Sequence, residues 1–364
     1  MNSGKYPQLE IALNKISSNY KHMEKVCSTY GIAITTIIKG VNGLTKVAES
    51  MYKAGSSSFG SSRLHQLKNI KEHLKHIETM LVRIPMITEV EDMVKFVDIS
   101  LNSEESTLEF INEVCKKNDI THKVILMCDL GDLREGIFEL DKIIRVAKRI
   151  EFEFENVILY GLGTNLSCLG SIVPTVKNLS RLVNIASSIE ENIGRKLQVI
   201  SGGGTTSLPL VFNGEMPHRI NHLRVGEGIL LARDLKDYFK LDMRGFYTDT
   251  FVLHAEIVEV QIKPSYPIGT MFIDAFGNKP SYEDKGLRKR AIVAVGNQDI
   301  GSSTKLISKL HGLDIIGSSS DHVVMDYTDT NVDLKVGDII DFELYYQALL
   351  FLTGSSDVSK VFKY

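Results

Sequence analysis

The chain has 364 residues, 43% hydrophobic and 24% charged, and its formal net charge is only −3. This composition is typical of a globular protein with two domains, and without a lysine- and arginine-rich cluster it gives no support for binding nucleic acid or an anionic membrane. No run reaches the roughly 18 apolar residues that span a bilayer, and residues 1–7 lack the apolar core of a signal peptide. The cysteines show no C-x-x-C spacing, so we expect a reduced cytoplasmic protein without disulfides or a metal site.

Apolar, strand-like segments alternate with helix-like stretches through the first two-thirds of the chain. We expect eight strands, at residues 34–38, 57–60, 80–84, 97–101, 124–128, 157–163, 197–201 and 222–225. Apolar residues at helical spacing predict intervening helices at residues 47–54, 64–74, 89–96, 106–116, 138–150 and 176–193. Eight strand–helix units over about 200 residues predict an α/β fold, a (β/α)8 TIM barrel, with a doubly wound open sheet as the alternative.

The pattern changes near residue 235, after which turns rather than long helices separate the strand-like segments. These segments are residues 250–261, 269–274, 290–294, 313–317, 323–326 and 337–345. We therefore expect a barrel over residues 1–235, followed by a C-terminal β-rich domain over residues 236–364. Residues 6–13 also alternate as a strand, which could pair with either domain.

Polar residues gather at the carboxyl ends of the expected barrel strands, the face on which barrels build their sites. The first strand ends on Lys39, which is either a solvated strand end or a lysine that forms a Schiff base. The seventh and eighth strands are followed by glycine-bearing loops, 201–206 and 224–228. Glycine lets the backbone approach a ligand closely, so these loops are a candidate phosphate site, and flexible turns are the alternative.

Three further positions carry charge or acid/base chemistry. Arg224 is either a structural arginine or a fixed cation that donates to a ring nitrogen or an oxyanion. Arg134, in the charged turn after strand five, is a candidate clamp for a substrate carboxylate, with a surface turn as the alternative. Asp321 and His322 share a polar turn and form a modest general-base candidate. A lysine, a phosphate site and two arginines on one face together indicate pyridoxal 5′-phosphate.

Four stretches of sequence, residues 129–136, 201–204, 223–227 and above all 274–290, carry a resemblance to a known family. The chain resembles the alanine racemase-like, fold-type III pyridoxal-phosphate enzymes over nearly its whole length, and looks most like the ornithine racemases among them. The resemblance implies an amino-acid racemase that interconverts L- and D-ornithine by exchanging the Cα proton through an external aldimine. It also implies a homodimer that shares its sites across the interface.

The resemblance also implies roles for individual residues. Lys39 would hold the cofactor and exchange the Cα proton on one face, and Arg224 would bond the pyridine nitrogen. Arg134 would bind the substrate carboxylate, and Asp321 would lie near the substrate across the dimer interface. The other cofactor-binding residues would be Asn165, Ser201, Gly203, Gly204, Thr205, Thr206, Gly226, Glu227 through its backbone, and Tyr346.

Two positions depart from the alanine racemase pattern. Asn297 replaces the tyrosine that acts as the second base, and Met127 replaces the carbamylated lysine that supports the clamp arginine. The second acid/base group is therefore unassigned, and we rank His322 first, Asp321 next and Cys168 third.

The departures leave the substrate open as well. A racemase for alanine, lysine or arginine, or one of broad specificity, is the alternative, and a non-catalytic pyridoxal-phosphate-binding protein is the alternative from a different class. The carboxylates that could bind the side-chain ammonium group of ornithine are Asp132, Glu135, Glu227 and Asp321.

Overall fold

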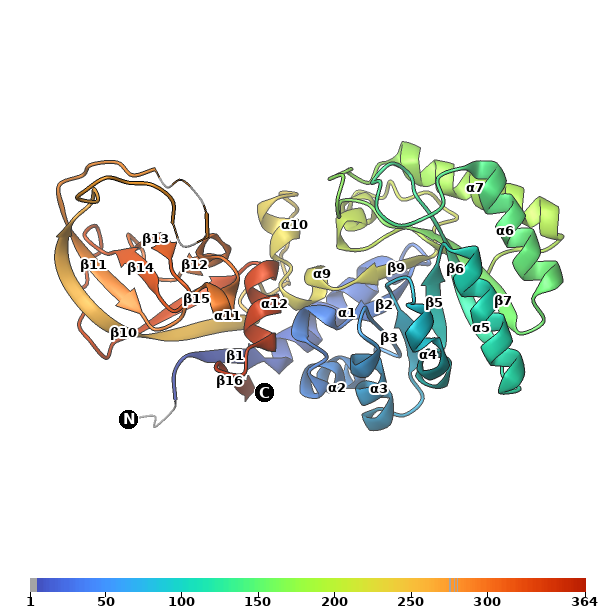
Figure 1. Cartoon of the computed structure of the whole chain (residues 1–364), viewed down its shortest axis with the longest axis horizontal. Coiled ribbons are helices and arrows are strands. Elements are labelled where there is room, and N and C mark those ends of the chain that lie inside the picture. The colour runs from blue at the N-terminus through green and yellow to red at the C-terminus, as the bar shows by residue number, and fades with distance from the viewer. Residues whose placement is uncertain (1–4, 275, 278, 280) are drawn as a thin grey trace. The chain divides into compact units, whose positions relative to one another are not determined.

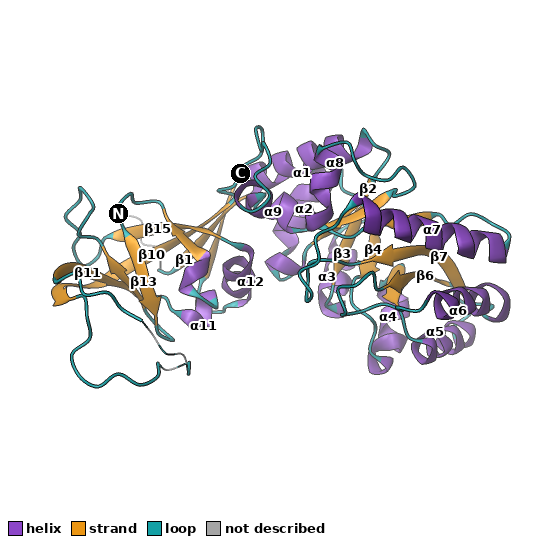
Figure 2. Ribbon diagram, turned by 90° about the horizontal axis from the view of Figure 1, so that it is seen from above, coloured by secondary structure: helices purple, strands orange, loops and turns teal. Residues whose placement is uncertain are grey.

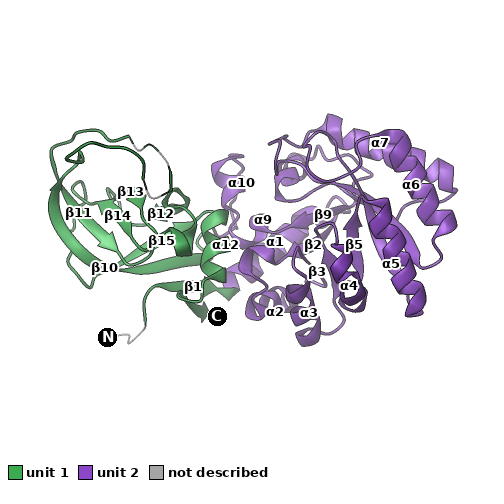
Figure 3. Ribbon diagram, viewed as in Figure 1, with its two compact units in different colours: residues 1–13, 248–364 green, residues 14–247 purple. Residues whose placement is uncertain are grey.

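A computed structural model of the chain describes residues 5–274, 276–277, 279 and 281–364 (Figure 1). The described chain forms two compact units (Figure 3). One unit is Asn14–Tyr247, and the other joins the segment that ends at Leu13 to Thr248–Tyr364. This division differs from the one predicted at residue 235, because the boundary follows Tyr247 and the N-terminal strand lies in the β-rich unit. Ala275, Asn278 and Pro280, in the stretch that most specifically carries the resemblance, lie outside the described residues.

Parallel strands close into a barrel in the first unit, so the open-sheet alternative is wrong. Each strand pairs with the next along the chain, and β9 pairs with β2 to complete the ring. The barrel strands are β2 (Ala33–Ile37), β3 (Ser58–Ser61), β4 (Glu78–Leu81), β5 (Ile99–Asn102), β6 (His122–Cys128), β7 (Val157–Thr164), β8 (Val199–Ser201) and β9 (His222–Val225). All eight predicted strands are confirmed, although β4 ends before the predicted limit.

Helices surround the barrel strands (Figure 2). They are α1 (Leu13–Ser28), α2 (Thr45–Lys53), α3 (Leu64–His73), α4 (Val90–Phe96), α5 (Glu105–Lys117), α6 (Leu140–Glu153), α7 (Val176–Ile193), α8 (Leu208–Phe212), α9 (Glu227–Leu230) and α10 (Arg233–Asp237). In α6, the buried residues Ile143, Val146, Ala147 and Ile150 fall on one face at helical spacing. No helix in the described part of the chain is both long enough and apolar enough to cross a bilayer.

The second unit is built on antiparallel pairing around the long strand β10. Its strands are β1 (Gln8–Ala12), β10 (Phe251–Pro264), β11 (Leu287–Val293), β12 (Leu306–Ser308), β13 (Asp314–Ser318), β14 (Val323–Asp326), β15 (Ile339–Leu344) and β16 (Ser359–Lys363). β1 runs antiparallel to β10 and parallel to β16, which decides the question of where the N-terminal strand pairs. The short helices α11 (Asn297–Ile300) and α12 (Tyr346–Gly354) complete the unit.

The strand predicted at residues 269–274 is wrong. This segment lies in the connection between β10 and β11, where it has no regular structure and no strand of the described residues pairs with it. Its apolar side chains are exposed, and Phe272 retains 78% of its accessible surface. An apolar run forms a strand only when a neighbouring strand can pair with its backbone, and the described part of the chain provides none here.

Candidate active site

Lys39 lies at the carboxyl end of the first barrel strand. It begins a short 3₁₀ turn, Lys39–Val41, which turns the chain away from β2. Its side chain is exposed at the barrel mouth, and its Nζ has no hydrogen-bond or ion-pair partner among the described residues. An amine in this state is available to a ligand.

The surroundings of Lys39 favour its neutral form. The protein around the ammonium group partly desolvates it, and this is the main cause that lowers the pKa of Lys39. Cys168 and Glu135 oppose the shift, whereas the positive charges of Arg134 and Arg224 add to it. A lysine with a lowered pKa is a better nucleophile near neutral pH, because more of it carries a free lone pair.

Arg224 is a buried cation in β9. It donates from Nη2 to the Thr164 carbonyl at 2.7 Å and from Nη1 to the Ser201 hydroxyl. Within the described part of the chain it forms no ion pair with a carboxylate. Burial lowers the pKa of Arg224 to about 10, with Glu135 acting in the opposite direction. The guanidinium therefore stays charged, and it has donors left for a further acceptor.

A chain of hydrogen bonds leads away from Arg224 through the barrel. His222 Nδ1 lies 2.8 Å from the Ser201 hydroxyl, His222 Nε2 lies 2.9 Å from the Thr35 hydroxyl, and that hydroxyl lies 2.8 Å from Ser58 Oγ. Arg224 can only donate, so the Ser201 hydroxyl accepts from Arg224 and donates its own proton to His222 Nδ1. The His222 ring then carries its proton on Nε2, which donates to the Thr35 hydroxyl. Burial and the charge of Arg224 lower the pKa of His222 to about 3, so the ring is neutral.

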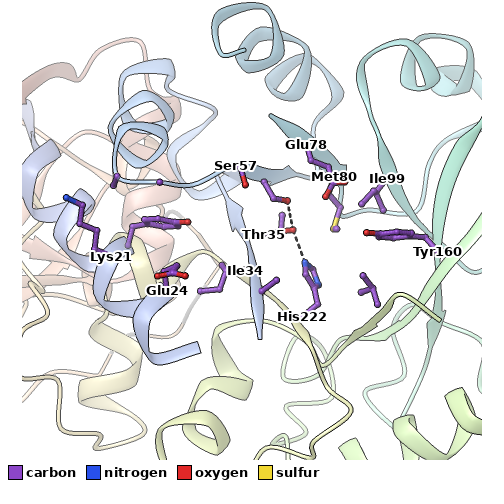
Figure 4. Close-up of a pocket in the computed structure, with 16 residues that line it drawn as sticks. Lys21, Glu24, Ile34, Thr35, Ser57, Glu78, Met80, Ile99, Tyr160 and His222 are labelled. Carbon is purple, nitrogen blue, oxygen red and sulfur yellow. Dashed lines mark hydrogen bonds between the residues drawn. The ribbon is translucent and has the colours of Figure 1, made fainter. Parts of the chain in front are cut away.

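The far end of this chain reaches a cavity at the amino ends of the barrel strands (Figure 4). The cavity has a volume of about 460 Å³, and Thr35, His222, Glu24, Glu78 and Tyr160 are among its lining residues. Figure 4 shows the Thr35 hydroxyl bonded to the His222 ring. Because Lys39 follows the carboxyl end of β2, this cavity and the lysine lie at opposite ends of the barrel.

Open backbone donors lie in the two glycine-bearing loops after β8 and β9. The N–H groups of Gly203, Gly204 and Gly226 have no acceptor among the described residues. Gly203 has a φ of 109°, and a Cβ on Gly204 would lie 2.9 Å from the Arg224 carbonyl oxygen, so both positions require glycine. Unpaired N–H groups in glycine loops are suited to binding a phosphate.

The side chains of these loops are less available than their backbone. Thr205 Oγ1 accepts from the Gly228 N–H at 3.1 Å, which leaves its own proton free to donate, whereas the Thr206 hydroxyl donates to the Leu166 carbonyl at 3.4 Å. The Glu227 carboxyl group accepts from the N–H groups of residues 233 and 234, and burial raises its pKa to about 8. The Glu227 carboxyl group is therefore not available to a phosphate in this loop, and the residue could contribute only through its backbone.

Asp132 holds the loop that follows β7 in place through hydrogen bonds to its backbone. Its carboxylate accepts backbone hydrogen bonds from Ser167 at 3.0 Å, Cys168 at 3.2 Å and Leu169 at 2.9 Å. Burial alone would raise the pKa of Asp132, but these bonds hold it below its usual value. The result is a fixed position for Asn165 and Cys168, whose side chains are bonded to each other at 2.9 Å.

Arg134 and Glu135 form an ion pair at the barrel mouth. Arg134 Nε lies 2.8 Å from Glu135 Oε2, and Asn165 Nδ2 lies 3.5 Å from Glu135 Oε1. Neither Nη group of Arg134 has a partner among the described residues, so this edge can meet a carboxylate. Met127 is fully buried in an apolar cluster and gives Arg134 no anionic support.

The remaining predicted site residues belong to the β-rich unit. Asp321 and His322 are exposed in the turn between β13 and β14, and their side chains have no bonding partner in the described chain. Asn297 lies beside the same turn, because its Oδ1 accepts from the Ser318 hydroxyl at 2.6 Å. Tyr346 is the first residue of α12. The structure thus gathers Asn297 with the two residues ranked first as its substitutes.

Known proteins resemble the chain along its whole length. Residues 11–234 match the family described as "Alanine racemase, N-terminal domain". An ornithine racemase of Acetoanaerobium sticklandii is 43% identical, covering 95% of this chain and 96% of that protein. A lysine racemase of Thermotoga maritima is 36% identical, covering 98% and 99%. The solved alanine racemase of Bartonella henselae, with covalently bound pyridoxal phosphate, superposes with a TM-score of 0.71 at 16% identity, covering 99% of this chain and 100% of that one.

Proposed function

The chain belongs to the alanine racemase family, and we propose that it is a pyridoxal-phosphate-dependent racemase that interconverts L- and D-ornithine. The observation that carries the proposal is the unpartnered amine of Lys39, which shares the barrel mouth with Arg224 and Arg134. The two similar racemases have ornithine and lysine in their names, which favours a substrate with a cationic side chain. Racemases for lysine, arginine or alanine, or of broad specificity, are the alternatives.

The residues at the barrel mouth fit the cofactor. Lys39 would hold its aldehyde carbon, the open N–H groups of Gly203, Gly204 and Gly226 would bind its phosphate, and Arg224 would donate to its pyridine nitrogen. Arg224 supports this assignment most directly, because it is a buried cation with spare donors and no carboxylate partner in the described chain. When bound, pyridoxal phosphate withdraws electrons from the substrate Cα and so makes its proton acidic.

The protein's own groups would bind the substrate and move the proton. The free Nη edge of Arg134 would hold the α-carboxylate, and this would orient Cα towards Lys39. Lys39 Nζ would take or return the proton on one face of Cα. Because Arg224 is always a donor, the pyridine nitrogen would stay unprotonated, which weakens the electron sink and limits side reactions.

Racemisation needs a second acid/base group, since one fixed base returns the proton to the same face. We keep the ranking of His322, then Asp321, then Cys168. Cys168 lies at the barrel mouth, where its thiol is close enough to interact electrostatically with both Lys39 and Arg224. His322 and Asp321 lie in an exposed turn and would serve a site across the interface of a homodimer.

The proposal is tested with purified protein supplied with pyridoxal phosphate. We expect a visible absorbance band from the bound cofactor and loss of optical rotation from L-ornithine, with D-ornithine identified by chiral chromatography. A panel of L-amino acids gives the substrate preference. A higher kcat/KM for alanine, lysine or arginine would replace ornithine by that amino acid, and a bound chromophore without any racemisation would favour the non-catalytic alternative.

A further inference from the structure

We propose that Glu135 selects the substrate, because its carboxylate is placed to pair with the cationic end of an amino-acid side chain. The proposal rests on the proposed function and adds to it the residue that distinguishes ornithine from a neutral amino acid of the same length. It concerns a choice among four carboxylates, Asp132, Glu135, Glu227 and Asp321. The four carboxylates differ in their hydrogen bonds and ion pairs within the protein, and therefore in their capacity to bind a substrate.

Two of the four are committed to the protein's own backbone. Both oxygens of Asp132 accept hydrogen bonds from the loop after β7, and a further N–H, from Ile172, lies 3.5 Å away. A carboxylate that is saturated in this way has no lone pair directed at a ligand. Glu227 is buried, caps the backbone at residues 233 and 234, and has a pKa of about 8, so it carries little charge near neutral pH.

Glu135 is the carboxylate that acts at the barrel mouth. Its negative charge opposes the lowering of the pKa of both Lys39 and Arg224, so it lies within electrostatic range of both of these groups. Its side chain is largely buried, with 17% of its surface accessible, and this strengthens its interaction with any charge that comes close. Asp321, by contrast, is exposed in the β-rich unit.

The bonds of Glu135 leave it able to accept a further ligand. Oε2 is paired with Arg134 Nε, while the long 3.5 Å contact with Asn165 is the one hydrogen bond that Oε1 makes with the described residues. A carboxylate oxygen can accept two hydrogen bonds, so Oε1 has room for an ammonium donor. The same residue would thus hold Arg134, which binds the α-carboxylate, and receive the other charged end of the substrate.

A competing explanation gives Glu135 a purely supporting role. If it only orients Arg134, removal of its charge would weaken the binding of every amino acid, because every amino acid has an α-carboxylate. If it reads the side chain, removal would weaken only cationic substrates. The two explanations therefore differ in the ratio of activities on L-ornithine and L-norvaline, which has the same carbon chain without the ammonium group.

The test compares wild type, Glu135→Gln and Glu135→Asp as cofactor-loaded enzymes with L-ornithine and L-norvaline. We expect Glu135→Gln to lower the ornithine/norvaline ratio of kcat/KM by about 10- to 100-fold, mostly through KM. The value for norvaline should fall less, because the glutamine amide oxygen can still accept from Arg134 Nε. Glu135→Asp should recover part of the ratio. Glu139→Gln removes an exposed charge from the same segment and should leave the ratio unchanged.

A second readout keeps this test separate from the proposed function. Titration of the cofactor absorbance gives a Kd for each amino acid even if ornithine is not turned over. An equal loss for both amino acids in Glu135→Gln would overturn the inference in favour of the supporting role. An unchanged ornithine/norvaline ratio of Kd values would also overturn it. Absence of ornithine racemisation by wild type, with the Kd ratio still dependent on Glu135, would overturn the proposed function alone.

Discussion

Polar side chains are hydrogen-bonded to one another at the amino end of the barrel, whereas, in the described part of the chain, charged side chains at the carboxyl end have unpaired donors. At the amino end, the hydroxyls of Thr35 and Ser58 and the ring of His222 are joined in one hydrogen-bonded chain. At the carboxyl end, Lys39 Nζ and the Nη edge of Arg134 have no bonding partner among the described residues. Unpaired charges in a partly desolvated site cost stability, so their concentration at the carboxyl end supports the proposal that a ligand binds there.

The contrast extends to charge. The amino-end cavity has carboxylates, Glu24 and Glu78, on its lining, and Glu78 lies 3.4 Å from Lys123. The mouth brings together three cations, Lys39, Arg134 and Arg224, with Glu135 as the acid that acts on the first and third. A site with excess positive charge suits a phosphate and a carboxylate. We therefore assign the proposed chemistry to the barrel mouth and not to the amino-end cavity.

Replacement of Lys39, at the carboxyl end of the barrel, should lower racemase activity far more than replacement of a charged residue at the amino end. We expect Lys39→Ala to lower racemase activity by about 10³-fold or more, because it removes both the cofactor's attachment and one acid/base group. The visible absorbance of the bound cofactor should be lost as well. Glu78→Gln, at the other end of the barrel, should leave both within about twofold of wild type, since an exposed ion pair contributes little. Retained racemisation in Lys39→Ala would contradict the assignment.

Release of the loop after β7 should have an intermediate effect. In Asp132→Asn, one oxygen becomes an NH2 group that faces backbone donors, so either the Ser167 bond or the Cys168 and Leu169 bonds are lost. We expect kcat/KM to fall by about 10- to 100-fold, because Asn165 and Cys168 lose their fixed position. Limited proteolysis should cut the loop faster. Asp141→Asn, an exposed change in α6, is the control, and equal effects of both variants would refute the role of Asp132.

Acid should destabilise the barrel through its interior histidines. Burial lowers the pKa of His222 to about 3 and that of His122 to about 4, from an ordinary value of 6.5. Below pH 6.5 the unfolded chain binds protons that the folded chain does not, so stability falls as pH falls. Each histidine contributes a slope of about 1.4 kcal/mol per pH unit until its folded pKa is reached.

The histidine contribution is measured by urea unfolding between pH 4.5 and 7.5. His222→Gln should remove one such contribution to the slope, whatever its effect on stability at pH 7.5. An unchanged slope would show that His222 is not the source. A parallel measurement on His122→Gln separates the two rings, since His122 bonds to Ser100 at 2.8 Å and lies outside the chain that leads to Arg224.

The sequence predicted the barrel well because its signals are local. Barrel strands such as β6 and β7 contain apolar runs, and α7 begins and ends where its apolar spacing begins and ends. The same kind of local pattern, an apolar run, wrongly predicted a strand at residues 269–274, where no strand of the described residues pairs with the segment. Helices α1 and α12 were not predicted, although in α1 the buried residues Ile16, Tyr20, Met23 and Cys27 follow helical spacing.

The sequence could indicate candidate site residues where the position of a residue in or after a strand determines which part of the fold it occupies. Lys39 and Arg224 follow or lie in barrel strands, so the fold alone brings them to one region. Roles that depend on side-chain partners were not predictable, and Asp132 is an example, since its partners lie more than thirty residues away. His222, which shares the Ser201 hydroxyl with Arg224, was missed, although a spacing of two in a strand places both residues on one face.

The position of β1 has a consequence for how the protein is made. Its partners, β10 and β16, are synthesised only after the whole barrel segment Asn14–Tyr247, and β16 comes last of the strands. The buried side chains of Leu9 and Ile11 therefore wait for their neighbours throughout translation. β1 is therefore synthesised before the barrel strands, and it can pair with β10 and β16 only after all of the barrel strands have been made.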